Sequence, residues 1–260
     1  FLGLTVLEEK LVKLLRVKDV TVVPGDLEND PIVLWEMGRA GARILRECLR
    51  PGIVLAVSGG TSCAALADML SEAPAPSDIT VVPARGGLGE EVDYQANTIA
   101  AKVAQKLKAN YRLLHLPDFL SQEALEMLLR EKRIKEILDL INSACILVHG
   151  IGTAEEMARR RGAAPEEMEI LREKGAVGEV FGCFYNSKGE IIEHVPSLGL
   201  YLEDLGSRVE NVIVVAGGRK KAGAIAAVVG NHPRDYLVLD EGAAKKIMEL
   251  YGEGETGVNF

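Results

Sequence analysis

Short apolar runs alternate along the chain with longer segments in which apolar residues recur every three or four positions. Such runs are typical of strands buried on both faces of a parallel sheet, and the longer segments are typical of amphipathic helices. The clearest helix begins at Pro31, carries Val33, Met37 and Ile44 on one face, and ends before Pro51. The expected strands are residues 20–23, 53–57, 79–83, 111–116, 144–149, 212–216 and 236–239, and the expected helices are residues 4–15, 31–48, 62–70, 93–108, 121–129, 133–141, 154–161, 165–174, 222–229 and 240–251.

One stretch departs from this alternation. Residues 177–185 are rich in aromatic and β-branched residues, residues 186–189 have turn composition, and residues 190–195 follow. This pattern predicts a small inserted β-hairpin. The rest of the chain predicts right-handed βαβ units, hence a doubly wound α/β fold with a mostly parallel, Rossmann-like sheet. We expect one domain over residues 1–251 and a flexible tail over residues 252–260.

Two helix starts carry capping signals. Thr153 and Glu156 form the T-x-x-E pattern of a capping box at the head of the helix over residues 154–161. Asp240 stands where the last helix begins and is its candidate N-cap.

The composition is that of a folded domain. The chain has 260 residues, of which 48% are hydrophobic and 26% charged, and a chain of this size buries roughly 75% of its unfolded surface without covalent staples. Apolar runs such as residues 53–57 and 212–216 are far shorter than the roughly 20 residues of a membrane-spanning helix. A formal net charge of −8 argues against this chain wrapping nucleic acid by itself, although it leaves room for a small basic pocket.

The cysteines and histidines give no sign of a metal or a disulfide framework. The four cysteines share no C-x-x-C spacing and lie in apolar stretches, and the four histidines form no H-x-x-x-H pair. We expect reduced thiols, a cytoplasmic protein, and neither a metal ion nor a cofactor.

Four expected strands run into glycine-rich turns that precede helices, at residues 58–62, 85–89, 150–153 and 217–221. The carboxyl ends of parallel strands meet at one edge of the sheet, where ligands bind in open α/β folds. Glycine lets backbone N–H groups approach a ligand, and a helix N-terminus offers unpaired donors and partial positive charge. Tight βα turns also favour glycine for their shape alone, but four in one chain predict at least one phosphate site. Neither a P-loop nor a dinucleotide fingerprint is present.

Charged residues near these turns support the prediction of a phosphate site. Arg85 and Lys221 lie beside helix N-termini, where a cation opposes the local dipole unless an anion sits between them. The arginines at residues 159–161 end a helix, and we interpret them mainly as solvated charges. Among acidic candidates for an acid–base or sugar-binding role, Glu179 has apolar neighbours, which leaves either a sugar-hydroxyl acceptor or a strand-edge surface charge. The other acidic candidates are Glu90, Glu91, Asp93 and Asp240.

Six strings of this sequence resemble the sugar-binding domain of SorC/DeoR-type transcriptional regulators. The most specific is V-P-A-R-G-G-L-G-E at residues 82–90, and the others lie at residues 57–62, 95–98, 148–152, 216–218 and 240–244. The resemblance runs over about residues 2–250. It implies a fold related to sugar-phosphate isomerases and deaminases, and a winged helix-turn-helix DNA-binding domain ahead of this chain.

The resemblance also implies function and partners. It points to a repressor of glycolytic genes that assembles as a homo-oligomer, a dimer or a tetramer, and binds operator DNA through the N-terminal domain. Its effector would be a phosphorylated sugar, with fructose 1,6-bisphosphate as the first candidate. The sugar would be bound without turnover and would weaken operator binding by altering subunit contacts.

Residues that match the family's strings acquire expected roles. Gly60, Thr61 and Ser62 would hold one phosphate at a helix N-terminus, with Ser62 standing where the family often has threonine. Arg85 would bind phosphate, and Lys221 would clamp the other phosphate. The complete expected ligand-binding set is Gly59, Gly60, Thr61, Ser62, Arg85, Gly87, Gln95, Arg161, Glu179 and Lys221.

The sequence leaves two questions open: which lysine reaches the ligand, and whether the domain has a function other than sensing. Arg219 and Lys220 differ from the small polar residues that the family often carries there, so either Lys220 or Lys221 could reach the ligand. A sugar-phosphate isomerase or deaminase on the same fold is the alternative function, and a pure assembly domain is a weaker one. Turnover, or a lack of any ligand response, would distinguish these from a sensor.

Overall fold

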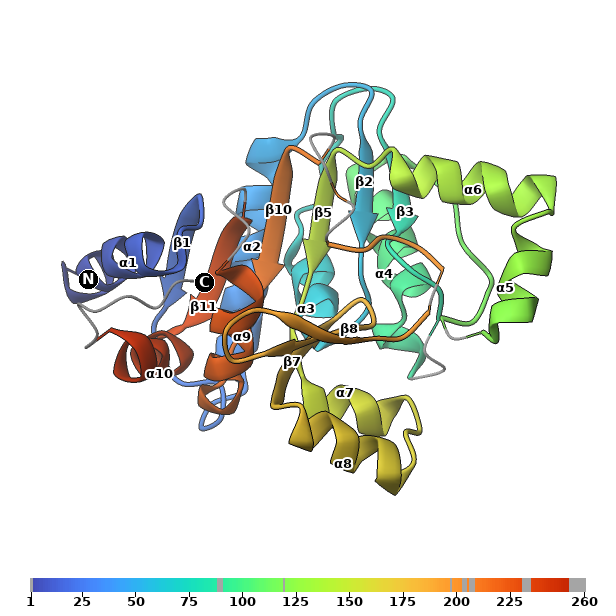
Figure 1. The fold of residues 1–260 in the computed structure, drawn as a ribbon. Coiled ribbons are helices and arrows are strands. Elements are labelled where there is room, and N and C mark those ends of the chain that lie inside the picture. Colours follow the sequence, from blue (N-terminus) through green and yellow to red (C-terminus); the bar gives the residue numbers. More distant parts are fainter. Residues whose placement is uncertain are drawn as a thin grey trace.

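The apolar runs of the sequence form the inner strands of one parallel sheet (Figure 1). The structure is a computed structural model that describes residues 2–87, 91–118, 120–196, 198–202, 205, 209–230 and 235–252. The strand order is β1-β11-β10-β5-β2-β3-β4, and every paired neighbour is parallel. The strands are β1 (Asp19–Val23), β2 (Val54–Val57), β3 (Thr80–Pro83), β4 (Asn110–Tyr111), β5 (Ile146–His149), β10 (Asn211–Val215) and β11 (Asp235–Asp240).

Successive side chains of each inner strand enter two different cores. In β2, Leu55 and Val57 pack on one side and Ala56 on the other, all with no exposed surface. A strand covered on both faces needs apolar residues at every position. This explains why the inner strands read as continuous apolar runs rather than as alternating patterns.

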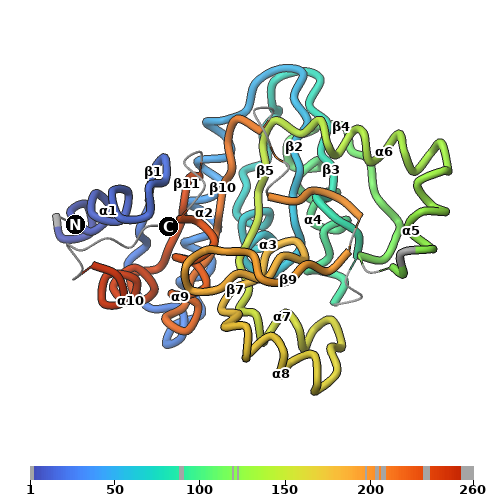
Figure 2. The backbone as a smooth tube through the Cα atoms, in the orientation of Figure 1, coloured from blue at the N-terminus to red at the C-terminus, as the bar shows by residue number. Residues whose placement is uncertain are grey.

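Helices cover both faces of the sheet. One core takes its helical side chains from α2 (Ile32–Cys48), α3 (Thr61–Met69) and α4 (Ala96–Leu107). The opposite core takes them from α1 (Leu2–Leu15), α6 (Lys132–Asn142), α9 (Ala222–Val229) and α10 (Glu241–Tyr251), with α5 (Gln122–Leu128) packed against it. Figure 2 shows α1 and α10, from opposite ends of the chain, side by side at the β1 edge. The predicted doubly wound α/β fold is confirmed.

The chain changes direction across the sheet between β2 and β5. From β2 it proceeds through β3 to β4 at one edge, then returns to β5 beside β2 and proceeds outward through β10 to β11. The turns that follow β2 and β5 therefore diverge to opposite sides. Such a divergence leaves a crevice at the carboxyl ends of the strands, where ligands bind in open α/β sheets.

A second sheet lies over this crevice and corrects the predicted hairpin. It has four antiparallel strands: β6 (Gly152–Thr153), β7 (Ala176–Val180), β8 (Cys183–Asn186) and β9 (Ile191–His194). The segment predicted as one strand, residues 177–185, turns back at Phe181 and Gly182, whose φ angles are +54° and +85°. Phenylalanine at positive φ is rare, so Gly182 was the one local signal for this turn, and the prediction passed over it. Two helices, α7 (Ala154–Arg160) and α8 (Pro165–Glu173), pack on this sheet.

Two further expectations were wrong in part. The predicted strand over residues 111–116 contributes only Tyr111 to β4, because the side-chain amide of Asn97 bonds both backbone groups of Leu114, at 2.9 and 3.1 Å, in place of a strand. The predicted helix over residues 93–108 is a 3-10 turn, η1 (Val92–Tyr94), followed by α4. Gln95 separates them with an extended backbone (φ −74°, ψ 142°).

The two predicted helix caps had different outcomes. Thr153 accepts a hydrogen bond from the Glu156 amide at 3.2 Å and caps α7, which confirms half of the predicted capping box, whereas the Glu156 carboxylate pairs with Arg160 and Lys221. Asp240 makes no cap bond to α10. Its carboxylate instead accepts from the amides of Leu27 (3.0 Å) and Gly218 (2.8 Å), which ties together the loops after β1 and β10.

The structure also bears on the predicted tail, on membrane-spanning helices and on the cysteines. The predicted tail lies, apart from Gly252, outside the described residues. Across the described ranges, no helix has the length and apolar character needed to cross a membrane. No disulfide joins the four cysteines, of which Cys63 and Cys183 are buried and Cys48 and Cys145 are half-buried.

Candidate ligand-binding site

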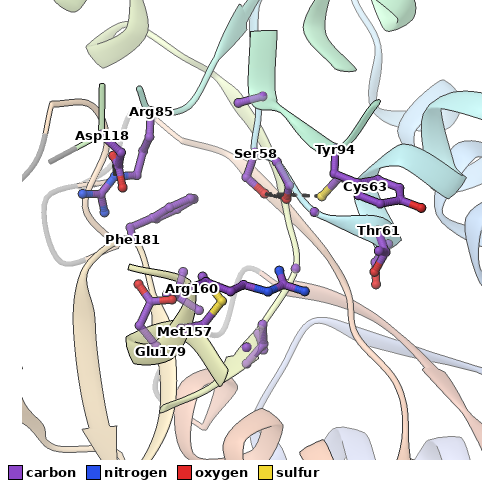
Figure 3. Close-up of a pocket in the computed structure, with 18 of the residues that line it drawn as sticks. Ser58, Thr61, Cys63, Arg85, Tyr94, Asp118, Met157, Arg160, Glu179 and Phe181 are labelled. Atoms are coloured by element: carbon purple, nitrogen blue, oxygen red, sulfur yellow. Dashed lines mark hydrogen bonds and ion pairs between the residues drawn. The ribbon is translucent and has the colours of Figure 1, made fainter. Parts of the chain in front are cut away.

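A crevice opens at the carboxyl ends of β2, β3 and β5, beneath the small sheet (Figure 3). Its walls come from the turns after these strands, from β7 and its turn, from α7, and from the 3-10 turn η3 (Arg219–Lys221). Nine of the ten expected ligand-binding residues line it: Gly59, Gly60, Thr61, Ser62, Arg85, Gln95, Arg161, Glu179 and Lys221. Their ligand-binding roles remain predictions, but residues far apart in the sequence share one cavity.

The turn after β2 delivers the N-terminus of α3 to the crevice. A side chain at Gly59 would put a Cβ 2.7 Å from the Tyr94 carbonyl oxygen, so only glycine fits there. The Gly60 amide donates to the same carbonyl at 2.8 Å and is therefore occupied within the protein. Thr61 and Ser62 begin α3, and the first amides of a helix have no acceptor inside it. These amides and the two hydroxyls are the donors that this wall presents.

Arg85 forms a buried ion pair at another wall. Its Nε donates to Asp118 Oδ1 at 3.0 Å, and the two side chains are only 6% and 4% exposed. The guanidinium also lies over the rings of Tyr201 (5.0 Å to the centroid) and Phe181 (5.7 Å). Neither terminal nitrogen of Arg85 has a hydrogen-bond acceptor among the residues that the structure describes. A buried cation with unused donors is suited to binding an anion.

Figure 3 shows how Arg85 is placed relative to the rest of the crevice. The guanidinium lies beside Asp118, and in this view the Phe181 ring lies between it and Ser58. Sequence reasoning missed Asp118. This residue reaches the site because Gly87 and Pro117 form an isolated parallel bridge, and nothing in the local sequence signals that contact.

Arg161 and Glu179 form a second buried pair. Glu179 Oε1 accepts from the Arg161 guanidinium and from the Gly182 amide, the latter at 2.5 Å. Burial raises the pKa of Glu179, and this exceeds the opposing effects of Arg161, of the Gly182 hydrogen bond and of Arg85. Glu179 is therefore not the strand-edge surface charge that the sequence left open. Its proposed contact with sugar hydroxyls would add to bonds that it already makes.

Glu156 is shared between two cations at the third charged wall. Its Oε1 lies 2.8 Å from an Arg160 terminal nitrogen, and its Oε2 lies 3.3 Å from Lys221 Nζ. Lys221 lines the crevice, whereas Lys220 is 87% exposed and lies 3.9 Å from Glu28. Of the two lysines that the sequence left as candidates, Lys221 is the one whose position in the crevice suits ligand binding. Arg160, interpreted from sequence as a solvated helix-end charge, also lines the crevice.

A neutral wall separates these charged groups. Ser58 Oγ lies 3.3 Å from Cys63 Sγ, and burial raises the pKa of the Cys63 thiol to about 11. Cys63 is therefore a neutral thiol near pH 7 and presents no thiolate nucleophile to the crevice. Tyr94 lies beside it, with its ring toward Thr61 (Figure 3).

Several sequence candidates lie elsewhere. Gly87 does not line the crevice, because its amide donates to Leu116 and its carbonyl accepts from Asp118, both at 2.9 Å. Glu91 and Asp93 are exposed, and Asp240 is engaged with the loops after β1 and β10. Glu90 lies outside the described residues.

The charges of the crevice indicate its chemistry. Four cationic side chains, Arg85, Arg160, Arg161 and Lys221, face three carboxylates, those of Asp118, Glu156 and Glu179. Together with the α3 N-terminus, this excess of donors and positive charge is suited to anions such as phosphate. Within the described ranges, no three His, Cys, Asp or Glu side chains gather where they could hold a metal ion.

Comparison with known proteins agrees with this chemistry. Residues 1–249 match the family described as "Putative sugar-binding domain". The chain is 43% identical to the central glycolytic genes regulator of Bacillus subtilis and 44% identical to that of Priestia megaterium, in each case over 95% of this chain and 72% of the relative. These relatives are named as regulators and not as enzymes.

Solved structures share the fold of this chain, and one of them is similar enough in sequence to support the family. The crystal structure of "the putative SorC family transcriptional regulator from Enterococcus faecalis" is 37% identical, with a TM-score of 0.84 over 93% of this chain and 99% of that one. The full-length sorbitol operon regulator SorC of Klebsiella pneumoniae, at 22% identity and a TM-score of 0.84 over 94% of this chain and 81% of that one, shares the fold. The chain therefore belongs to the sugar-binding domain family of SorC-type transcriptional regulators.

Proposed function

We propose that this chain is the effector-binding domain of a cytoplasmic repressor of glycolytic genes, and that its crevice binds a phosphorylated sugar without converting it. The convergence of four cationic side chains and the α3 N-terminus on one cavity carries this proposal. A phosphate monoester carries about −1.5 to −2 charge at neutral pH. Such a group needs both the positive charge and the N–H donors that this cavity supplies.

Fructose 1,6-bisphosphate is the first candidate effector. The cationic groups form separate centres: in Figure 3, Arg85 lies beside Asp118 at the upper left, and Arg160 lies lower in the view beside Met157. A sugar with a phosphate at each end can engage both centres at once, whereas a monophosphate engages one. The names of the relatives from Bacillus subtilis and Priestia megaterium support a glycolytic effector for this chain.

Regulation follows from linkage between effector binding and assembly. We propose that the chain forms a homo-oligomer and that a winged helix-turn-helix domain ahead of it binds operator DNA. An effector shifts an equilibrium between DNA-binding and released states only as far as its affinity for the two states differs. The relevant comparison is therefore between effector affinity with and without operator DNA.

A thermal-shift panel tests the proposal. Fructose 1,6-bisphosphate, fructose 6-phosphate, glucose 6-phosphate, inorganic phosphate and unphosphorylated fructose are compared, with phosphorus NMR to follow each sugar phosphate. We expect a saturable rise in Tm with phosphorylated sugars, largest for the bisphosphate, and unchanged spectra. Conversion of the sugar would favour the isomerase or deaminase alternative. The absence of any response would favour a pure assembly domain.

A further inference from the structure

The ion pairs of the crevice are of two kinds. The Arg85–Asp118 and Arg161–Glu179 pairs are buried, with every side chain 7% exposed or less. Glu156, Arg160 and Lys221 are each about one-third exposed. A partly exposed ion pair is worth at most about 1 kcal/mol, whereas breaking a buried one costs about 3–5 kcal/mol. The Glu156 pairs are therefore the ones that an incoming anion can displace.

The Glu156 carboxylate bridges two cations with its two oxygens, as a phosphate group can. Each carboxylate oxygen takes one of them, Arg160 from its own helix α7 and Lys221 from η3, which is distant in the sequence. Both cations and the Glu156 carboxylate line the same cavity as the α3 N-terminus. A phosphate that bridges Arg160 and Lys221 must replace the carboxylate at these donors, and it then lies close to a displaced negative charge.

The local backbone does not depend on this side chain. The Glu156 amide is held by Thr153 Oγ1 at 3.2 Å, which caps α7 whether or not the carboxylate is present. The carboxylate can therefore leave its cations without loss of the first turn of the helix. Its neighbour Glu155 pairs with Arg159 (2.8 Å) and Arg172 (3.5 Å) and does not line the crevice.

We propose that Glu156 is an internal competitor for the phosphate group, which occupies Arg160 and Lys221 in the ligand-free protein and thereby sets the effector affinity. This inference rests on the proposed function. Glu156 acts through the two cations and makes no contact with the sugar. The carboxylate weakens phosphate binding. The domain therefore responds at a higher effector concentration than it would without Glu156.

Calorimetric titration of Glu156→Gln with fructose 1,6-bisphosphate tests the inference. We expect a Kd lower by about fivefold than that of the unsubstituted chain, because a competing charge pair of about 1 kcal/mol is removed. Glu155→Gln is the matched control, since it removes one charge from the same helix outside the crevice, and its Kd should stay within about twofold. Glu156→Ala should show the same direction as Glu156→Gln, and it serves if the glutamine variant fails to fold.

The outcomes separate this inference from the proposed function. If the unsubstituted chain binds the bisphosphate and both Glu156 variants bind it equally or more weakly, Glu156 orients the cations and the inference is wrong, while the proposed function stands. If the unsubstituted chain binds neither the bisphosphate nor any monophosphate, the proposed function fails and the inference fails with it. A gain of similar size in Glu155→Gln would show a general charge effect and would also overturn the inference.

Discussion

Arg85 Nε donates a hydrogen bond of 3.0 Å to Asp118 Oδ1, and this pair joins two segments that are 33 residues apart in the chain. Both side chains are buried beside the rings of Phe181 and Tyr201. The carboxylate accepts from Nε and thereby orients the guanidinium. The two terminal nitrogens keep their donors for another anion, which makes Arg85 the buried centre of the proposed site.

Removal of the Arg85 guanidinium should weaken effector binding. We expect Arg85→Ala to raise the Kd for fructose 1,6-bisphosphate at least tenfold, which is about 1.4 kcal/mol, because a desolvated charge-assisted contact to phosphate is lost. Titration calorimetry measures the change. Arg39→Ala is the control, since Arg39 pairs with Glu36 on the surface of α2, and its Kd should not change. An unaltered affinity in Arg85→Ala would remove Arg85 from the site.

Removal of the Asp118 carboxylate should destabilise the fold more than removal of a carboxylate from a surface ion pair. Asp118→Ala leaves the Arg85 charge buried without its partner, so we expect a loss of about 3 kcal/mol in the free energy of unfolding. The double variant Arg85→Met/Asp118→Leu should lose less, because no charge is left buried. Urea denaturation provides both values, with Glu36→Ala as a surface control that should lose under about 1 kcal/mol. Equal losses in Asp118→Ala and Glu36→Ala would contradict a buried, charged Arg85.

The two neighbouring lysines should behave differently. Lys221 lines the crevice beside Glu156, and Lys220 faces solvent near Glu28. We therefore expect Lys221→Ala to weaken fructose 1,6-bisphosphate binding about tenfold and Lys220→Ala to leave it within about twofold. The two substitutions remove the same charge, so a comparison of their Kd values isolates position. A larger effect at Lys220 would place the second phosphate outside this crevice.

Much of the fold was predictable because it follows from local pattern. Runs such as residues 212–216 are apolar at every position, and this is what a strand between two helical layers requires. The errors arise where tertiary contacts decide the outcome. The Asn97 amide ends β4 early by bonding Leu114, and Phe181 turns the chain at a φ that its residue type rarely adopts.

The site residues in glycine-rich turns after strands were predictable from sequence. Those whose place in the site depends on their position around a helix were missed. The residues Arg159, Arg160 and Arg161 look alike in sequence, yet a helix rotates successive side chains by about 100°. Arg159 pairs with Glu155 on the surface, Arg160 reaches the crevice, and Arg161 is buried against Glu179. The i,i+4 spacing does not distinguish them, because Glu155 and Arg159 have the same spacing as Glu156 and Arg160.

The protonation of Glu179 should make stability depend on pH with a defined sign. Burial raises the pKa of Glu179 in the folded protein above the ordinary 4.5, so the folded state holds the proton more tightly than the unfolded state. The stability from this proton is present below pH 4.5 and is lost as pH rises through the raised pKa. We expect the free energy of unfolding, relative to that of Glu179→Gln, to fall across this window in denaturant titrations at successive pH values.

Glu193 supplies a control of opposite sign. A hydrogen bond from Lys174 lowers the pKa of this partly exposed carboxyl. Its contribution is present above pH 4.5 and is lost as pH falls through the lowered pKa. The corresponding comparison with Glu193→Gln should therefore rise with pH. A difference between the unsubstituted chain and Glu179→Gln that is flat or rises would contradict a raised pKa at Glu179.

A crystal structure of the chain with fructose 1,6-bisphosphate shows directly whether a phosphorylated sugar occupies the crevice between the β2 and β5 turns. We predict intact sugar density there, with one phosphate at the N-terminus of α3 near Arg160 and Lys221 and the other at Arg85. Density for the sugar at a different surface, with this crevice empty at saturating bisphosphate, would contradict effector binding in this crevice.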